Sequence, residues 1–442
     1  MGLKYIEQVK SVVLVLLILL SFTLTFAIWT YSPVIQTNDE AIVDISIAEK
    51  RNLENVIKPY RMILSQDEAL KGTVASQPIE FAFNNMKTWE IQTVELASNK
   101  ADTDQINDFV KAPNRASFFF AADVPIEILG NILNFADHNF PEVYFNRLII
   151  DWNGDISDSV TLYFISTSQQ KIYTATAQKA DKLGFTKRIL EHAEKMQVYN
   201  EIVRDNKLSL YVSSIPENIG SYTYSIKDVE SDKFKDALFN NPSLVRINPV
   251  GMNEQQFTDD SALMNVDFTR KSLSYVHPAS ENENPANPVD LINNSLNFVN
   301  EHNGWTDDYR YSRMNTSARQ INYQLYLAGL PVFSRLTSTD ITQYWGVDRV
   351  YRYFRPTYSL NAAIRLKTRE VELASGQSIY DFLSTATDIN MSSIDDLVIG
   401  YYLSQDDDQA LFNLEPSWYY LESGVWVRVS PELLGGAKFG LE

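Results

Sequence analysis

An uncharged apolar segment near the start of the chain constrains its architecture more than any other feature. No charged side chain occurs between Lys10 and Asp39, and the 19 residues Ser11–Trp29 include thirteen Val, Leu, Ile or Phe side chains. At about 1.5 Å per residue, a helix of this length spans a hydrocarbon core of roughly 30 Å. The apolar side chains favour insertion by about 4–8 kcal/mol, before the smaller Ser and Thr penalties. The segment therefore predicts a transmembrane helix over residues 11–31.

The charges on either side of this segment predict its orientation. Lys4, Lys10 and the amino terminus precede it with only Glu7 against them, whereas acidic residues follow it. The positive-inside rule then leaves residues 1–10 as a cytoplasmic stub and places the bulk of the chain outside the cell membrane. A cleaved signal peptide is the alternative, with Thr25-Phe26-Ala27 as a weak cleavage site. We favour a retained single-pass anchor, because the apolar core exceeds the usual length of about 7–15 residues in a signal peptide.

The composition of the remainder narrows the class of protein. About 410 residues follow the segment, enough for two or three domains, and the 45% hydrophobic content is sufficient for packed cores. The chain has no cysteine, which excludes disulfides, thiol nucleophiles and Cys-ligated metals. Its net charge of −18 disfavours binding to nucleic acid and to anionic lipid.

The first exported region, residues 56–205, follows a polar juxtamembrane linker over residues 32–55 and combines strands with helices. Strands are predicted where β-branched or aromatic residues are bounded by turn formers, at Phe118–Phe120, Arg147–Asp151, Leu162–Thr167 and Lys171–Ala177. Helices are predicted at Ile126–Phe135 and Gln178–Tyr199, the second from partial helical spacing of its apolar residues.

The clearest predicted element is a helix over Asn287–Gly304, in a second exported region that covers residues 206–356. Asn287 is a suitable N-cap and Pro288 a suitable first helical residue. Apolar residues then recur at three- and four-residue steps from Val289 to Val299, and the glycine ends the helix. Other elements in this region are predicted at Leu208–Ser213, Tyr222–Ile226, Ser231–Phe239 (a helix), Ser261–Phe268, Ser272–His277, Tyr309–Arg313 and Ile321–Leu327.

A third region, residues 357–442, repeats the order of elements found in the second. A helix at Ser378–Thr387 is followed by a strand at Leu397–Leu403 and by a hairpin over Trp418–Val429. The predicted fold class is therefore α+β: one N-terminal transmembrane helix, then about three extracytoplasmic α+β domains with antiparallel sheets, the last two as candidates for structural relatedness.

The sequence offers little that resembles catalytic or metal-binding chemistry. Its four histidines are widely spaced, and no H-E-x-x-H, G-x-S-x-G or phosphate-binding glycine motif occurs. Asp151–Asp158 has the carboxylate density of a calcium loop, but its glycine occupies the fourth position instead of the sixth, so a hairpin turn at Asn153-Gly154 is the better interpretation. Asp406–Asp408 is interpreted as a solvated hairpin tip. We predict no catalytic, cofactor-binding or metal-binding residue.

One face of the apolar segment is a candidate surface for partner helices. Helices in lipid associate through small or hydroxylated residues and close packing. Ser21 and Thr25 lie one turn apart, with Leu14 and Leu17 roughly on the same face. The alternative is that the two hydroxyl groups only bond the carbonyl oxygens of their own helix, four residues back.

Two stretches of sequence carry a resemblance to a known family. Lys10–Pro33, after the short basic stub, closely resembles the amino terminus of the YycH (WalH) family, and Asn300–Trp305 to Gly329–Phe333 is similar to a further segment of it. The total length and the absence of cysteine agree with the family as well. Elsewhere the resemblance rests on the layout of the chain.

The resemblance implies a regulator and not an enzyme. Members of this family are membrane-anchored and have a three-domain extracytoplasmic part. They pair with the related protein YycI and contact the sensor histidine kinase YycG (WalK) of an essential cell-wall two-component system in low-GC Gram-positive bacteria. Membrane insertion through residues 11–31, these two protein partners and no cofactor are therefore expected, and a homodimer is compatible with the same reading.

Two other classes of function remain alternatives. A membrane-anchored cell-wall hydrolase would need a cleft with convergent carboxylates. A module that senses wall ligands would need a specific pocket between the exported domains.

Overall fold

The computed structural model describes residues 14, 16–23, 48–66, 69–154, 158–282, 284–302, 304–387, 389–406 and 411–429. The chain divides into two units, Met1–Asp44 and Ile45–Glu442. In the first unit, the described residues are helical and their large apolar side chains are exposed. Over the described residues, none of the helices combines the length and the apolar character needed to cross a bilayer.

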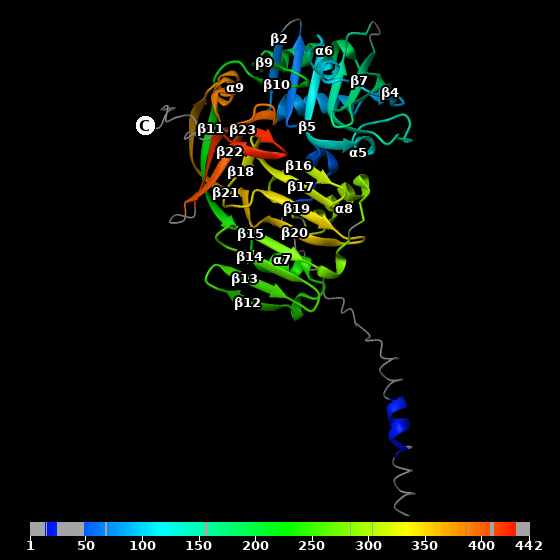
Figure 1. The fold of residues 1–442 in the computed structure, drawn as a ribbon, viewed down its shortest axis with the longest axis vertical. Helices are drawn as coiled ribbons and strands as arrows, with labels where there is room; N and C mark the ends of the chain where they lie inside the picture. The colour runs from blue at the N-terminus through cyan, green and yellow to red at the C-terminus, as the bar shows by residue number, and fades with distance from the viewer. Residues whose placement is uncertain are drawn as a thin grey trace, which may run out of the picture. The chain divides into compact units, whose positions relative to one another are not determined.

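The second unit begins with a ten-stranded antiparallel sheet (Figure 1). Its strands follow the order β10-β9-β2-β1-β5-β6-β7-β8-β3, and β4 is joined to β8. The strands are β1 (Arg61–Gln66), β2 (Ala69–Thr73), β3 (Glu90–Ile91), β4 (Glu95–Ser98), β5 (Arg115–Pro125), β6 (Tyr144–Asp151), β7 (Ser159–Ser166), β8 (Lys171–Gln178), β9 (Gln197–Arg204) and β10 (Lys207–Ser213). The helices are α2 (Leu53–Val56), α3 (Ser76–Met86), α4 (Thr103–Lys111), α5 (Ile126–Gly130) and α6 (Lys182–Ala193).

Both faces of this sheet are covered, as the run of three phenylalanines in β5 requires. Successive side chains of a strand point to opposite faces. Phe118 and Phe120 belong to the core that includes the buried faces of α3 and α6, whereas Phe119 packs in a second cluster with Ile106 and Val110 of α4. The predicted strands of this region are confirmed as parts of β5, β6, β7 and β8.

The remaining strands form a fourteen-stranded sheet in the order β12-β13-β14-β15-β20-β19-β17-β18-β22-β23-β11-β21, with β16 on β17 and β24 on β23. Its pairings are antiparallel except for β18 with β22. The strands are β11 (Glu217–Asp228), β12 (Arg246–Val250), β13 (Glu254–Thr258), β14 (Leu263–Asp267), β15 (Ser272–Val276), β16 (Asp308–Asn315), β17 (Gln320–Leu327), β18 (Leu330–Phe333), β19 (Asp340–Trp345), β20 (Val350–Pro356), β21 (Tyr358–Leu373), β22 (Ile394–Asp406), β23 (Leu411–Glu422) and β24 (Val425–Arg428). The helices are α7 (Ser231–Leu238), α8 (Pro288–Glu301) and α9 (Gly376–Thr385), with short 3-10 turns at Pro242–Leu244 and Pro278–Ser280.

Helix α8 begins where its sequence predicts, but it ends at Glu301, before the predicted stop at Gly304. The side chain of Asn287 accepts hydrogen bonds from the backbone N–H groups of Val289 and Asp290, at 2.9 and 3.2 Å. Of the apolar positions predicted to face inward, Ile292, Leu296 and Val299 are buried, whereas Val289 is only partly buried. Capping and apolar spacing therefore agree on the start, the register and the buried face of this helix.

Two helix predictions in the first exported region were wrong in extent. The predicted helix Ile126–Phe135 is only α5, which ends at Gly130. The predicted helix Gln178–Tyr199 is α6 alone, because both of its ends are in strands: Gln178 pairs with Ser159 in β8, and Tyr199 pairs with Leu70 in β9. Cross-strand pairing overrides a marginal helical pattern at both ends.

Candidate functional site

The predicted partner-binding face falls only partly within the described residues. Leu14, Leu17 and Ser21 lie in the described helix and are exposed, whereas Thr25 lies outside the described residues. The hydroxyl of the neighbouring Thr23 donates to the carbonyl oxygens of Leu19 and Leu20, at 3.1 and 2.9 Å. Thr23 thus bonds its own backbone, and the choice between the two modes for Ser21 and Thr25 stays a prediction.

A buried ion pair joins the two sheets of the second unit. The guanidinium of Arg61, on β1, contacts the carboxylate of Asp396, on β22, at 2.6 Å. The same guanidinium donates to the carbonyl oxygens of Tyr211 and Leu397. Arg61 is 2% exposed, so it is held within the interface between the sheets and not on the surface.

Aromatic side chains contact this ion pair. The hydroxyl of Tyr60 donates to Asp396 at 2.5 Å, and the rings of Tyr60 and Phe119 lie 5.1 and 5.4 Å from the Arg61 guanidinium. Burial, with the nearby Asp396 charge, raises the pKa of Tyr60, so its hydroxyl remains a donor. Burial alone would lower the pKa of Arg61, but the Asp396 carboxylate raises it. The pair is therefore a charged contact with a neutral phenol as its third member.

Two further contacts cross the same boundary. The guanidinium of Arg204, at the end of β9, donates to the carbonyl oxygen of Ile394, and the ammonium of Lys207 donates to that of Ser392. The hairpin β9–β10 is thus tied to the start of β22 close to the Arg61–Asp396 pair.

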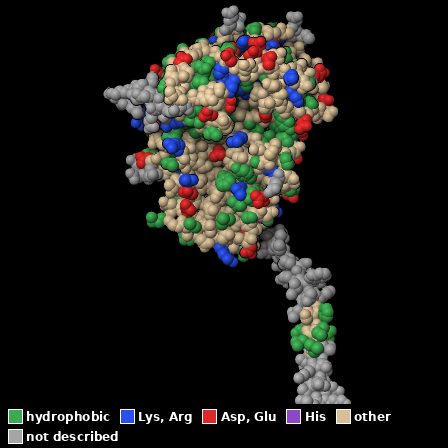
Figure 2. Space-filling model, viewed as in Figure 1, with side chains coloured by type: hydrophobic (Ala, Val, Ile, Leu, Met, Phe, Trp, Pro, Cys, Tyr) green, Lys and Arg blue, Asp and Glu red, His purple; other side chains and the backbone are tan. Residues whose placement is uncertain are grey.

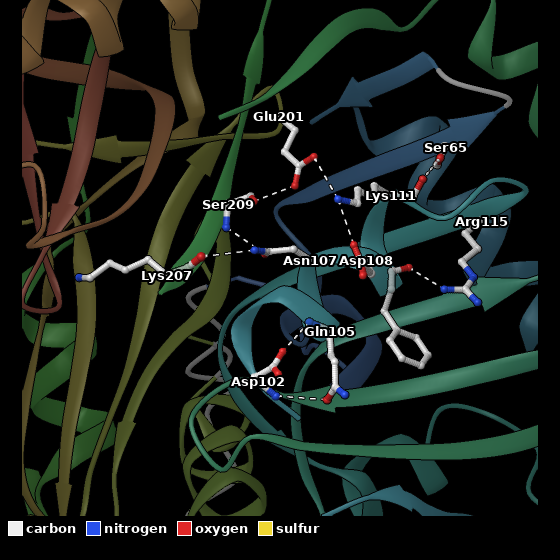
Figure 3. Close-up of polar contacts among 11 residues, drawn as sticks. Ser65, Asp102, Gln105, Asn107, Asp108, Lys111, Arg115, Glu201, Lys207 and Ser209 are labelled. Atoms are coloured by element: carbon white, nitrogen blue, oxygen red, sulfur yellow. Dashed lines mark hydrogen bonds and ion pairs between the residues drawn. The ribbon is translucent and has the colours of Figure 1, made fainter. Parts of the chain in front are cut away.

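Helix α4 holds strand β10, which leads from the first sheet into the second (Figure 3). Asn107 accepts from the backbone N–H of Ser209 at 2.9 Å and donates to the carbonyl oxygen of Lys207 at 3.3 Å. The hydroxyl of Ser209 donates to Glu201 on β9 at 2.7 Å. Glu201 in turn lies 4.0 Å from the ammonium of Lys111.

The ends of α4 are also fixed (Figure 3). Asp102 and Gln105 form a capping box at its start. At its end, the carbonyl oxygen of Lys111 accepts from the hydroxyl of Ser65, and that of Phe109 accepts from Arg115. The helix therefore positions β10 rigidly at the junction between the two sheets.

A hollow of about 900 Å³ opens beside this junction and is lined from both sheets. The hydroxyl of Tyr311, on β16, donates to the carbonyl oxygen of Asp123, on β5, at 2.8 Å across it. Acids from both sides line the hollow, namely Asp123, Glu142 and Asp340. Asp340 accepts from Asn322 and Thr342, and Asp123 accepts from Ser168 at 2.6 Å. Glu142 accepts from the hydroxyl of Tyr144 at 3.3 Å, so each of the three carboxylates has a hydrogen-bond donor.

No local pattern in the sequence indicated a role for Tyr60, Arg61 or Asp396. The partners in each contact are more than 330 positions apart, and neither stretch contains a recognisable motif. In the acidic stretch Asp151–Asp158, Asp151 forms an ion pair with Arg115 at 2.7 Å. Strand β6 ends at Asp151 and strand β7 begins at Ser159, and the two strands pair as a hairpin requires.

The fold and the junction define a class of protein, namely an α+β protein whose two antiparallel-rich sheets are joined by a buried ion pair. Family models for the YycH protein match this chain, the N-terminal domain over residues 7–193 and the C-terminal domain over residues 207–434. The chain belongs to the YycH family, which confirms the resemblance found in the sequence.

One curated sequence and one crystal structure are similar to this chain. The chain is 22% identical over 456 residues to the "Two-component system WalR/WalK regulatory protein YycH" of Bacillus subtilis (strain 168), covering 99% of both chains. It also matches the crystal structure of YycH from Bacillus subtilis with a TM-score of 0.74 and 20% identity, covering 87% of this chain and 99% of that one. The mixed α+β fold is thus shared with that structure.

Proposed function

We propose that this chain is a membrane-anchored extracytoplasmic regulator of a cell-wall sensor histidine kinase. The observation that carries the proposal is the match along 99% of both chains to a relative named as a WalR/WalK regulatory protein. The absence of a recognised catalytic motif in the sequence fits a role in protein–protein contact. A YycI-like membrane protein is the second proposed partner, and a homodimer is compatible with the same role.

The proposed topology rests on the apolar segment. Residues 11–31 would cross the cell membrane with residues 1–10 in the cytoplasm, because the basic residues precede the segment and the acidic residues follow it. The proposed exported part comprises the linker 32–55 and the regions 56–205, 206–356 and 357–442. The face formed by Leu14, Leu17, Ser21 and Thr25 is the proposed contact with partner helices in the membrane.

The junction suggests how a partner that contacts one sheet could change the position of the other. A switch in a kinase needs a differential contact energy of about 1–3 kcal/mol to change activity several-fold or more. Arg61 bonds both Asp396 and Leu397 of the other sheet, so a rotation of one sheet against the other would disturb both contacts. The two sheets would then respond to a partner as one body.

The proposal is tested by purification of the tagged full-length protein from membranes in detergent. A matched version carries an unrelated transmembrane helix in place of Ser11–Trp29. We expect the kinase to be recovered with the native helix and to be reduced with the replacement. Equal recovery would move the contact to the exported part, and recovery with neither version would refute the regulator.

The hollow beside the junction favours a second candidate function, the sensing of a small wall ligand. It is lined from both sheets, as the pocket of a sensing module would be. Titration of the full-length protein with soluble wall fragments, followed by protection of Tyr311 and Asn322 in footprinting, tests this role. Fragments that change neither residue would remove it.

A further inference from the structure

Strand β21 is a long edge of the fourteen-stranded sheet. It has 16 residues and, among the described strands, pairs along one side only, with β11. In Figure 1 the two strands form the left margin of that sheet. The opposite edge, β12, has 5 residues and contains Pro249, which blocks strand pairing from outside. No proline interrupts β21.

The middle of β21 is open to solvent. Every residue from Ile364 to Glu370 is exposed, including two large apolar side chains, Ile364 at 67% and Leu366 at 56%. The register also shifts here: Arg365 pairs with Tyr224 and Lys367 with Thr223, so Leu366 has no partner on β11. A bulge of this kind re-aims a side chain at the rim of a sheet.

The charge of this stretch is opposite to that of the chain. From Ile364 to Glu370 there are three cations and one acid, in a protein with 56 acidic and 38 basic residues. The facing residues of β11, from Asn218 to Ile226, carry no charge. Figure 2 shows Lys and Arg side chains on this margin of the body.

Contacts hold two of these cations in place. The guanidinium of Arg365 lies 4.9 and 5.7 Å from the ring centres of Tyr222 and Tyr224. Arg369 forms an ion pair with Glu415 at 3.1 Å, in which both side chains are about half exposed. The guanidinium groups of Arg365 and Arg369 are therefore held at fixed positions along the strand, and Glu415 balances the charge of Arg369.

We propose that the edge of β21 from Ile364 to Arg369 binds an extended, carboxylate-rich segment of a partner protein. Such a segment would add a strand to the sheet. Its backbone would bond the outer N–H and C=O groups, and its carboxylates would meet the cations. This inference rests on the proposed regulatory function, since it names a contact surface for the partner of that regulator.

A second copy of the chain is a weaker occupant. Two copies would each bring a net charge of −18. Antiparallel pairing centred on Lys367 would also place Arg365 opposite Arg369, and like charges directly opposite destabilise a pair of strands. The neighbouring register would place Arg365 opposite Glu370, so the test includes the oligomeric state.

The test uses the full-length protein in detergent and three synthetic peptides. One alternates Glu with Val, one alternates Lys with Val, and the third is the Glu–Val peptide with alternate amides N-methylated, which removes its strand hydrogen bonds. Binding is followed by fluorescence anisotropy, and hydrogen exchange is measured over residues 358–373. We expect the acidic peptide alone to bind with saturation and to slow exchange in β21.

Matched variants assign the binding to this edge. The pair Arg365→Glu and Lys367→Glu should weaken the acidic peptide at least about tenfold, a change of about 1.4 kcal/mol, whereas Arg246→Glu on β12 should leave it unchanged. Equal binding of acidic and basic peptides, an unaffected double variant, or no slowed exchange at about 1 mM peptide would each overturn the proposal. Hydrogen exchange in β21 that slows as the protein concentration is raised, without any peptide, would assign the edge to a second copy. Protection that is lost when the chain is ended at Val429 would assign it to the chain's own C-terminal residues.

Failure here is separable from failure of the proposed function. The double variant is purified from membranes beside the unaltered protein. Kinase recovered equally with both would remove the β21 edge and leave the regulator intact, whereas kinase recovered with neither would refute the regulator itself.

Discussion

Arg61 and Asp396 form a buried ion pair at 2.6 Å although 335 positions separate them in the sequence. The first lies in the sheet that opens the second unit and the second lies in the sheet that closes it. Buried ion pairs add little stability over a well-packed apolar pair, but loss of one partner leaves an uncompensated charge. The pair therefore specifies one arrangement of the two sheets.

Replacement of Asp396 by Ala should be strongly destabilising. It leaves the Arg61 guanidinium without its carboxylate and the Tyr60 hydroxyl without its acceptor. We expect a loss of about 3–5 kcal/mol in the free energy of unfolding, measured by urea denaturation.

The matched controls are an exposed pair and a double variant. Arg369→Ala breaks the exposed pair with Glu415 and should cost no more than about 1 kcal/mol. Arg61→Met with Asp396→Leu should cost less than the sum of the two single changes, because no unpaired charge remains. Strict additivity of the two changes would contradict the coupling.

Gly376, at the start of α9, should not tolerate a methyl group. A Cβ atom there would lie 2.4 Å from Cβ of Val212 and 2.9 Å from the Trp418 ring. Gly376→Ala should therefore destabilise by about 1–3 kcal/mol through overpacking against β10. Gly154→Ala is the control, since a Cβ atom there meets nothing within 4 Å. Equal melting temperatures for the two variants would show that α9 moves away freely.

The N-cap of α8 can be tested in the same way. Asn287→Ala removes the acceptor for two backbone N–H groups and should cost about 1 kcal/mol. Asn287→Asp retains an acceptor and should recover most of that loss in thermal unfolding. A neutral Ala variant would mean that water satisfies these groups equally well.

Local patterns correctly predicted the elements that are stabilised by interactions within one stretch of the sequence. Helix α8 has its cap, its proline and its apolar spacing within one stretch, so its start was predicted to the residue. The helix predicted over Gln178–Tyr199 failed at both ends because Gln178 and Tyr199 are paired with strands from elsewhere in the chain. A pattern that depends on a distant neighbour cannot be read within a window of sequence.

The residues of the candidate site differ in the same way: some could be predicted from local sequence, and others could not. Leu14, Leu17 and Ser21 were placed on one face by helical geometry alone, and their role in binding stays a prediction. Arg61 and Asp396 could not have been paired beforehand, since each lies in an ordinary strand and only the packing of the two sheets brings them together. The family resemblance was readable because it depends on contiguous residues at the amino terminus.

His302 should make the stability of the second unit depend on pH. It is buried at the end of α8, where its Nε2 lies 3.3 Å from the hydroxyl of Tyr353. Burial, together with the charge of Arg355, lowers its pKa to about 3. An unfolded His has a pKa of about 6.5, so between these values the unfolded chain binds a proton that the folded chain does not. The free energy of unfolding is therefore highest above about pH 6.5 and falls as the pH is lowered towards 3.

The expected size of this effect is about 2 kcal/mol between pH 7 and pH 5. Burial also raises the pKa of Asp307, which acts with the opposite sign because its stabilising proton is lost as the pH rises. The comparison is therefore made between the unaltered chain and His302→Gln, since both retain Asp307. Urea denaturation across this range should show that the free energy of unfolding falls less on acidification in the variant than in the unaltered chain, whatever the stability of the variant at pH 7. Parallel pH profiles would mean that His302 takes up a proton in the folded state, and that its buried site opens to water.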